Sequence, residues 1–349
     1  TGILSTVSLD HATPACFYAH EDIRDNYNSI ASQMAGSGVD YFAGGFIRGA
    51  FDKYKERAKT PKEVIKLIKN EGYQIAANRE KFNSLKPGTK AWAYTKYDED
   101  AAMNYEIDRT TEEISLAEFT QKGIELLNGD KGFFMMIEGG KIDWASHAND
   151  PGAMLHDMNA FDEAVEMAVE FYKEHQDETL IVVTSDHDCG GLNLSLINND
   201  YKTNLSLLKH QKISNIEMTK KVHNWKKEQL SWDNTLDSLQ YYFGFEDEDI
   251  HQDMKLTETE KQNLKKAYKL SMKGEKGETE HEKLLYGGYE PLTIASTKLL
   301  TRKAGLSWST YSHTAVAVPV FAKGAGADKF TGFYENTDIS KKIMEAAGL

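Results

Sequence analysis

Runs of apolar residues alternate with amphipathic stretches along most of the chain. Residues 133–137 and 179–184 are apolar almost throughout, which is typical of strands buried on both faces of a parallel sheet. Residues 116–127 and 154–172 carry their apolar positions at helical spacing, so they predict amphipathic helices. This alternation predicts an α/β fold with a doubly wound, mostly parallel central sheet and helices on both faces.

Other segments extend this core toward both ends of the chain. The pattern predicts strands at 3–7, 39–42 and 315–321 and helices at 15–37, 292–304 and 338–347. Between residues 192 and 291 the chain becomes polar and rich in Lys and Glu, and a helix such as 258–270 has only a thin apolar stripe. We therefore predict three parts: an α/β core over 1–191, a helical insertion over 192–291 that acts as a lid or interface, and the continued core over 292–349.

The composition narrows the choice of partners. A net charge of −13 argues against nucleic acid as a stable partner and against anionic membrane surfaces, and no stretch is long and apolar enough to span a bilayer. Cys16 and Cys189 are the only cysteines, too few for a disulfide framework. The chain opens directly on an apolar strand pattern without a signal peptide, so we expect Thr1 to lie inside a domain whose first strand–helix unit is missing.

Polar residues with metal-binding chemistry follow the run 133–137. Glu138 and two glycines end the strand, and Asp143 and His147 follow at a spacing of four, which places both on one helix face. Ligands of open α/β sheets collect at the carboxyl ends of the strands. Carboxylate with imidazole suits zinc, whereas oxygen alone suits magnesium. The alternative is a helix N-cap followed by a surface pair of Asp143 with Lys141.

Similar clusters flank three other predicted strands. They consist of Asp186 and His187 after residues 179–184, His313 before residues 315–321, and Asp10, His11 and Thr13 after residues 3–7. Any one of these histidines alone is most simply an ordinary histidine. The repetition at core strands predicts a site for one or two zinc ions together with a harder cation.

These clusters resemble the alkaline phosphatase family in both order and spacing. The resemblance rests on residues 10–14 (DHATP), 137–147 (IEGGKIDWASH), 184–191 (TSDHDCGG) and 312–314 (SHT). It implies hydrolysis of phosphomonoesters with two zinc ions and one magnesium ion. It also implies a periplasmic or secreted location and is compatible with a homodimer.

The resemblance assigns each ligand to a cation. It implies one zinc held by Asp143, His147 and His313, a second zinc held by Asp186 and His187, and magnesium held by Glu138 and Thr13 with His11 beside it. Arg24 falls at the family position of the arginine that binds phosphate, a task suited to a planar guanidinium. Without the resemblance, Arg24 is more simply a helix-surface residue paired with Glu21 or Asp22.

The sequence departs from the family pattern in three ways. Trp144 stands where some members carry Lys or His, and Cys189 stands near a position that is often a histidine. The family's nucleophilic serine, and an aspartate that bridges two metals, precede the motif at Asp10, so we expect both to lie outside this chain. The alternatives are a non-catalytic metal-binding fragment and a phosphodiesterase or sulfatase on the same scaffold, although the predicted role of Arg24 argues against the last two.

Overall fold

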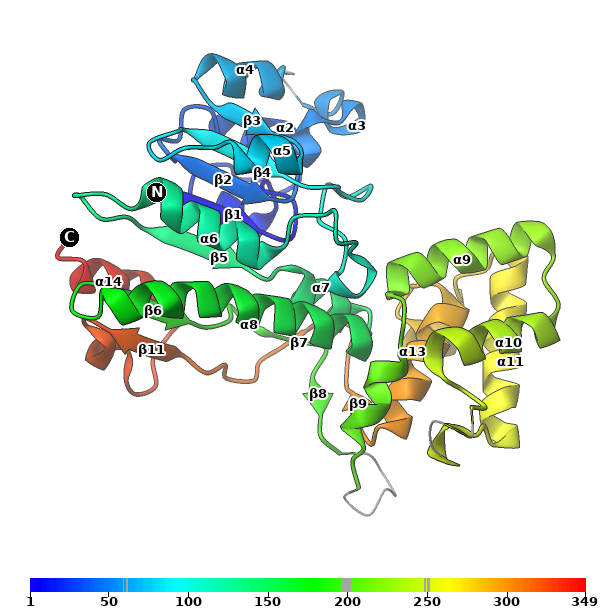
Figure 1. The fold of residues 1–349 in the computed structure, drawn as a ribbon. Helices are drawn as coiled ribbons and strands as arrows, with labels where there is room; N and C mark the ends of the chain where they lie inside the picture. Colours follow the sequence, from blue (N-terminus) through cyan, green and yellow to red (C-terminus); the bar gives the residue numbers. More distant parts are fainter. Residues whose placement is uncertain (59, 61, 196–201, 248, 250–251) are drawn as a thin grey trace.

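A computed structural model describes residues 1–58, 60, 62–195, 202–247, 249 and 252–349 (Figure 1). Its centre is a five-stranded parallel sheet with the strand order β3-β4-β2-β1-β5. The strands are β1 (Gly2–Ser5), β2 (Tyr41–Gly44), β3 (Gln74–Ala76), β4 (Ala91–Tyr94) and β5 (Met135–Glu138). The predicted α/β fold with a parallel central sheet is therefore confirmed.

Helices cover both faces of this sheet because successive strand residues point to opposite faces. On β1, Ile3 packs in a cluster with α2 (Tyr27–Gln33) and α4 (Val64–Asn70), whereas Leu4 packs in a second cluster with α6 (Leu116–Leu127). The long helix α8 (Pro151–Glu174) lies against α6. The shorter elements are α1 (Ala12–Ala15), α3 (Asp52–Lys55), α5 (Arg79–Asn83), α7 (Lys141–His147), α14 (Asp338–Ala346), η1 (Arg48–Ala50), η2 (Glu106–Asp108), η3 (Leu205–His210), η4 (Gln252–Met254) and η5 (Ala327–Phe330).

The predicted helix over 15–37 is wrong in its middle. Only α1 and α2 form, and residues 16–26 run between them as turns and extended chain. The apolar residues of this stretch make tertiary contacts instead: Phe17 stacks on Phe134, and the Tyr18 hydroxyl donates to the Leu9 carbonyl at 3.0 Å. These contacts hold the segment against the residue before β5 and a residue after β1.

The strand predicted over 179–184 is present as β6 (Leu180–Val183), but it is not part of the five-stranded sheet. It pairs antiparallel with β11 (Phe321–Gly324), and residues 315–320, predicted as strand, are not strand. Both β5 and β6 are only half-buried, contrary to the prediction of full burial. Among the described residues, β5 pairs only with β1 and β6 pairs only with β11, so each strand has one edge without a paired strand.

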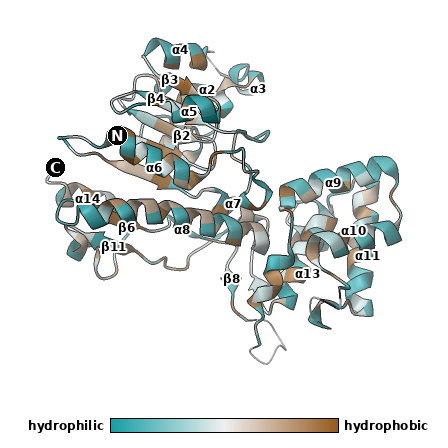
Figure 2. Ribbon diagram, viewed as in Figure 1, coloured by the Kyte–Doolittle hydropathy of each residue, from teal (hydrophilic) through white to brown (hydrophobic). Residues whose placement is uncertain are grey.

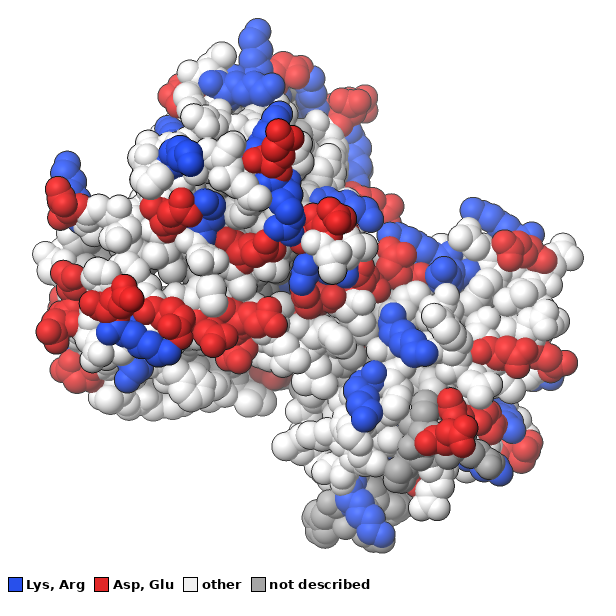
Figure 3. Space-filling view, in the orientation of Figure 1, with Lys and Arg blue, Asp and Glu red and all other residues white. Residues whose placement is uncertain are grey.

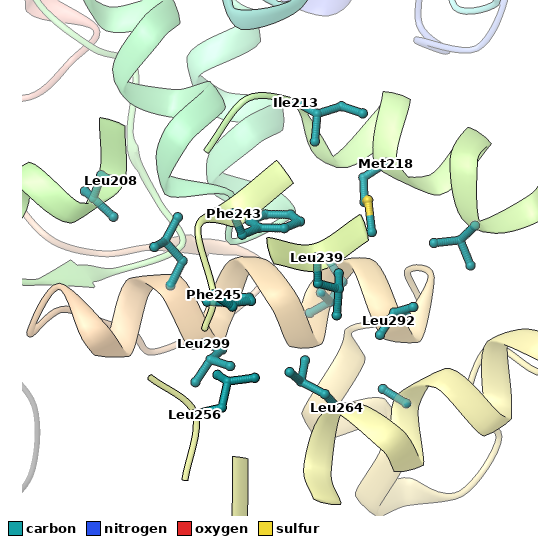
Figure 4. Close-up of a cluster of buried hydrophobic side chains, with 14 of the residues drawn as sticks. Leu208, Ile213, Met218, Leu239, Phe243, Phe245, Leu256, Leu264, Leu292 and Leu299 are labelled. Atoms are coloured by element: carbon teal, nitrogen blue, oxygen red, sulfur yellow. The ribbon is translucent and has the colours of Figure 1, made fainter. Parts of the chain in front are cut away.

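A compact helical unit with its own core combines helices of the predicted insertion with the helix that follows it. Its helices are α9 (Asn215–Glu228), α10 (Trp232–Phe243), α11 (Glu258–Lys273), α12 (Glu280–Tyr286) and α13 (Pro291–Lys303). Helices α9 and α11 are mostly hydrophilic (Figure 2), but their narrow stripes of apolar residues pack into one hydrophobic cluster (Figure 4). Helix α13, which the sequence placed with the sheet, contributes Leu292 and Leu299 to this cluster. The three-part division itself stays a prediction.

Four short strands, of two residues each, flank the helical unit in the sequence: β7 (Asp188–Cys189), β8 (Leu192–Asn193), β9 (Ser307–Trp308) and β10 (His313–Thr314). They form two antiparallel pairs, β7 with β10 and β8 with β9. The face drawn in Figure 3 mixes both signs of charge, with acidic side chains gathered along α8. Among the described helices, none has the length and apolar character needed to cross a membrane.

Candidate metal and phosphate site

Asp143, His147 and His313 meet at the end of α7. The Nε2 atoms of His147 and His313 are 3.1 Å apart, and Asp143 Oδ1 lies 3.5 Å from the first and 3.6 Å from the second. Ligands of a tetrahedral zinc, at bonds of about 2.0–2.1 Å, are separated by about 3.3 Å. Asp143 Oδ1 is also buried without a hydrogen-bond partner among the described residues. The three atoms therefore fit one face of a zinc coordination tetrahedron.

Neighbouring backbone groups orient His147 toward this point. His147 Nδ1 lies 2.6 Å from the Tyr311 carbonyl oxygen, so Nδ1–H donates to it and the lone pair of Nε2 is left for a metal. Asn149 Nδ2 donates to the carbonyls of Ser146 at 3.1 Å and Thr310 at 2.9 Å. This amide ties the end of α7 to the segment that carries His313.

Asp186 and His187 lie next to this set. His187 Nε2 is 3.3 Å from Asp186 Oδ2, and the imidazole ring stacks on that of His313 with centroids 3.5 Å apart. His187 Nδ1 is buried without a hydrogen-bond partner in the described part of the chain. The structure thus brings all five residues that were predicted as zinc ligands into one region.

Glu138 is a half-buried acid at the end of β5. The hydroxyl groups of Ser5 and Thr13 donate to its carboxylate. Burial raises the pKa of Glu138 to about 7 against the effect of these hydrogen bonds, and the nearby charges of Asp186 and Asp143 raise it as well. A bound cation would reverse this tendency because it stabilises the carboxylate. Ser5 was not predicted as a site residue. It lies opposite Glu138 at the end of the neighbouring strand β1, and this position in the strand pairing could have indicated it.

Arg24 lies beside His11 rather than on a helix. Its Nη2 is 3.2 Å from His11 Nε2, while Glu21, the alternative partner, accepts a hydrogen bond from Asn26. Burial lowers the pKa of His11 to about 4, and the charges of Arg24 and Arg48 lower it further. His11 is therefore neutral near pH 7, and its Nε2 lone pair accepts the hydrogen bond from Arg24.

Trp144 lies among cations that the sequence reasoning did not identify. The Arg48 guanidinium is 5.5 Å from the Trp144 ring, and the Lys141 amine is 4.9 Å from it. Lys141 is fully buried, with Nζ 3.2 Å from Asp98 Oδ2. The alternative surface pair of Asp143 with Lys141 is therefore wrong, because helix α7 begins with Lys141 pointing into the protein.

Asp10 has a structural part in the site. Its buried carboxylate accepts hydrogen bonds from the backbone N–H groups of Arg48 at 3.0 Å and Gly49 at 2.7 Å. Burial raises the pKa of Asp10 to about 6 in spite of these bonds. Asp10 therefore joins the segment of His11 and α1 to the start of η1 at Arg48.

The five-stranded parallel α/β core thus brings together imidazole and carboxylate groups of the kind that bind divalent metals. A sequence model of the alkaline phosphatase family matches residues 1–349, and the chain belongs to this family. The resemblance read from the motifs is thereby confirmed, as is the expectation of an enzyme of this family.

Individual relatives agree with this assignment. The chain is 29% identical to alkaline phosphatase 3 of Bacillus subtilis, covering 99% of this chain and 67% of that protein. The crystal structure of a cold-active alkaline phosphatase from the psychrophile Shewanella sp. superposes with a TM-score of 0.76 at 28% identity, covering 99% of this chain and 74% of that one. A mutant of TAB5 alkaline phosphatase has Mg bound in its M3 site; it superposes with a TM-score of 0.60 at 25% identity, covering 100% and 72%.

Proposed function

We propose that this chain supplies the metal ligands and the phosphate-binding arginine of an enzyme that hydrolyses phosphomonoesters. One zinc is assigned to Asp143, His147 and His313. The second zinc is assigned to Asp186 and His187, and magnesium to Glu138 and Thr13. The observation that carries the proposal is the approach of Asp143, His147 and His313 at distances that fit a tetrahedral zinc.

The chemistry of the donors supports this assignment. The unpartnered buried atoms Asp143 Oδ1 and His187 Nδ1 gain a partner when a cation binds. When bound by these residues, zinc would supply polarisation of a phosphoryl oxygen and activation of the attacking oxygen. Glu138 offers only oxygen and shares its carboxylate with the hydroxyls of Ser5 and Thr13, which is the donor type that magnesium prefers.

Arg24 and His11 would hold the phosphate. The neutral His11 accepts a hydrogen bond from one N–H group of the Arg24 guanidinium and carries no charge of its own. The other N–H groups of the guanidinium therefore remain available to bind a phosphate dianion. The position of Arg24 is exposed, as a group that meets an incoming substrate has to be. A pair of guanidinium donors also neutralises charge that develops on the transferring phosphoryl oxygens.

The nucleophilic serine is expected from a segment outside residues 1–349. Among the described residues, β5 and β6 each pair along one edge only, and their apolar side chains are half-buried. Both observations support the addition of a further strand beside them. Without that serine a nucleophile is not held near phosphorus, and positioning supplies much of the rate. The chain alone is therefore expected to hydrolyse p-nitrophenyl phosphate slowly or not at all.

Two measurements test the proposal. Zinc content is determined for the purified chain, for His313→Ala and for His223→Ala, an exposed histidine of α9 that serves as the matched control. Only His313→Ala should lose zinc; equal zinc in all three would refute the ligand assignment. Turnover of p-nitrophenyl phosphate is then compared for the chain and for a longer chain extended before Thr1, and equal rates would show that hydrolysis uses another nucleophile.

Parallel assays separate the alternative functions. Bis-(p-nitrophenyl) phosphate and p-nitrophenyl sulfate report phosphodiesterase and sulfatase activity on the same proteins. Faster turnover of either compound than of the monoester would favour the alternative scaffold function. The homodimer and the periplasmic or secreted location remain predictions.

A further inference from the structure

The thiol of Cys189 lies beside the first set of donors. One ligand atom from each of Asp143, His147, Cys189 and His313 can be chosen so that all four atoms lie within 4.8 Å of one another. In a tetrahedral zinc site the edges that join sulfur to nitrogen or oxygen measure about 3.6 Å, given Zn–S bonds of about 2.3 Å. A sulfur at the upper limit of 4.8 Å would have to move by about 1 Å to reach this separation.

The register of the short strands explains why the thiol points there. Cys189 on β7 is paired directly with His313 on β10, and residues opposite each other on antiparallel strands place their side chains on the same face. The other pair of this ladder, Asp188 with Thr314, forms a side-chain hydrogen bond of 2.5 Å. Because successive residues alternate faces, that bond lies on the side away from the thiol.

The turn after Cys189 packs closely against α7, the helix that carries Asp143 and His147. Gly190 has φ +76°, and a Cβ atom built there would lie 2.8 Å from the Ser146 carbonyl oxygen and 2.6 Å from the Trp308 ring. Only glycine tolerates this approach. The Cys189 thiol donates a hydrogen bond to the Asp143 carbonyl oxygen, with Sγ 3.6 Å from it. The sulfur also lies near the ligand atoms of Asp143 and His147.

We propose that Cys189 is the fourth protein ligand of the metal held by Asp143, His147 and His313. This inference rests on the proposed zinc site and adds a sulfur donor to it. On binding, the thiol loses its proton to solvent and the thiolate sulfur donates an electron pair to the metal. The resulting set of one sulfur, two nitrogens and one oxygen favours zinc or cadmium over magnesium. With Cys189 as a ligand, phosphate would compete with the thiolate for this metal.

Cobalt(II) substitution tests the inference, because zinc itself gives no absorption spectrum. The metal-free chain is titrated with cobalt(II) while visible d–d bands and the near-ultraviolet thiolate-to-cobalt band are recorded. The wild-type chain and Cys16→Ser, which removes the exposed second cysteine, should show both features. Cys189→Ser should keep the visible bands and lose the near-ultraviolet band.

Each other outcome has a separate meaning. Visible bands without a thiolate band in the wild-type chain, or a thiolate band that survives in Cys189→Ser, would overturn the assignment of Cys189 and leave the zinc site intact. Failure to bind cobalt at all would overturn the zinc site and the inference together. If Cys189→Ser does not fold, cadmium-113 resonance of the wild-type chain decides: a shift typical of nitrogen and oxygen ligands alone refutes the sulfur ligand.

Discussion

Replacement of Lys141 by methionine should destabilise the protein strongly, although Lys141 contacts none of the proposed metal positions. The Lys141 side chain is 1% exposed and that of Asp98 is 5% exposed, with Nζ 3.2 Å from Oδ2. Methionine keeps most of the length of the lysine stem but removes the charge. Asp98 is then left as a buried carboxylate without its cation.

The structure suggests the size of the effect. Breaking a buried ion pair by removing one partner costs about 3–5 kcal/mol, because the remaining charge is uncompensated. The Lys141 amine also lies 3.9 Å from the centre of the Tyr105 ring, and such a desolvated cation–π contact contributes about 2 kcal/mol. These terms overlap, so we expect a loss of about 3–5 kcal/mol in the free energy of unfolding.

Urea unfolding of the metal-free proteins measures this change. The control is Lys173→Met, which breaks the exposed pair of Lys173 with Glu170 and should leave the midpoint unchanged. The double variant Lys141→Met/Asp98→Asn should be more stable than Lys141→Met alone. It removes the uncompensated charge, and the amide oxygen can still accept from the backbone N–H groups of residues 100 and 102.

A loss below about 1 kcal/mol for Lys141→Met would show that the pair is not a buried interaction of the kind described. A double variant less stable than the single one would show that packing, not charge, determines the effect. Because α7 begins at Lys141 and carries Asp143 and His147, zinc affinity should fall together with stability.

Three other changes have definite expected results. Glu138→Gln should weaken the response of activity to magnesium and leave zinc content nearly intact; loss of zinc with an unchanged magnesium response would contradict the separation of the two sites. Burial raises the pKa of Asp157 to about 8, so its contribution to stability is present below about pH 4 and is lost as the pH rises toward 8. Asp157→Asn should flatten this decline of the unfolding free energy, measured by urea unfolding at several pH values. An equally steep decline in the variant would refute the assignment. Residues 202–306, expressed alone, should unfold cooperatively because α9, α10, α11 and α13 share one core, whereas a noncooperative circular-dichroism transition would show that this core depends on the sheet.

Local spacing was enough to predict several features of this protein. The alternation of apolar runs and helical stripes predicts the α/β sheet, because strand and helix periods are properties of neighbouring residues. The spacing of four between Asp143 and His147 places them on one face of α7 for the same reason. Glu138 could be placed at a strand end from the glycines that follow it.

Other features depended on contacts between distant segments. Arg24 reaches His11 because residues 16–26 leave the helical path and pack on Phe134 and Leu9, a preference that helical periodicity cannot reveal. The polar helices of the insertion form a core because their thin stripes face one another, which depends on how the helices pack.

The neighbours of the ligands were likewise decided by tertiary structure. Ser5 meets Glu138 through the parallel register of β1 and β5, more than a hundred residues apart in sequence. Cys189 stands opposite His313 through the antiparallel register of β7 and β10. The motifs predicted the candidate metal ligands, because donor type belongs to the residue itself. Which donors share one cation depends on strand register and burial, and these arise only when the whole sheet is assembled.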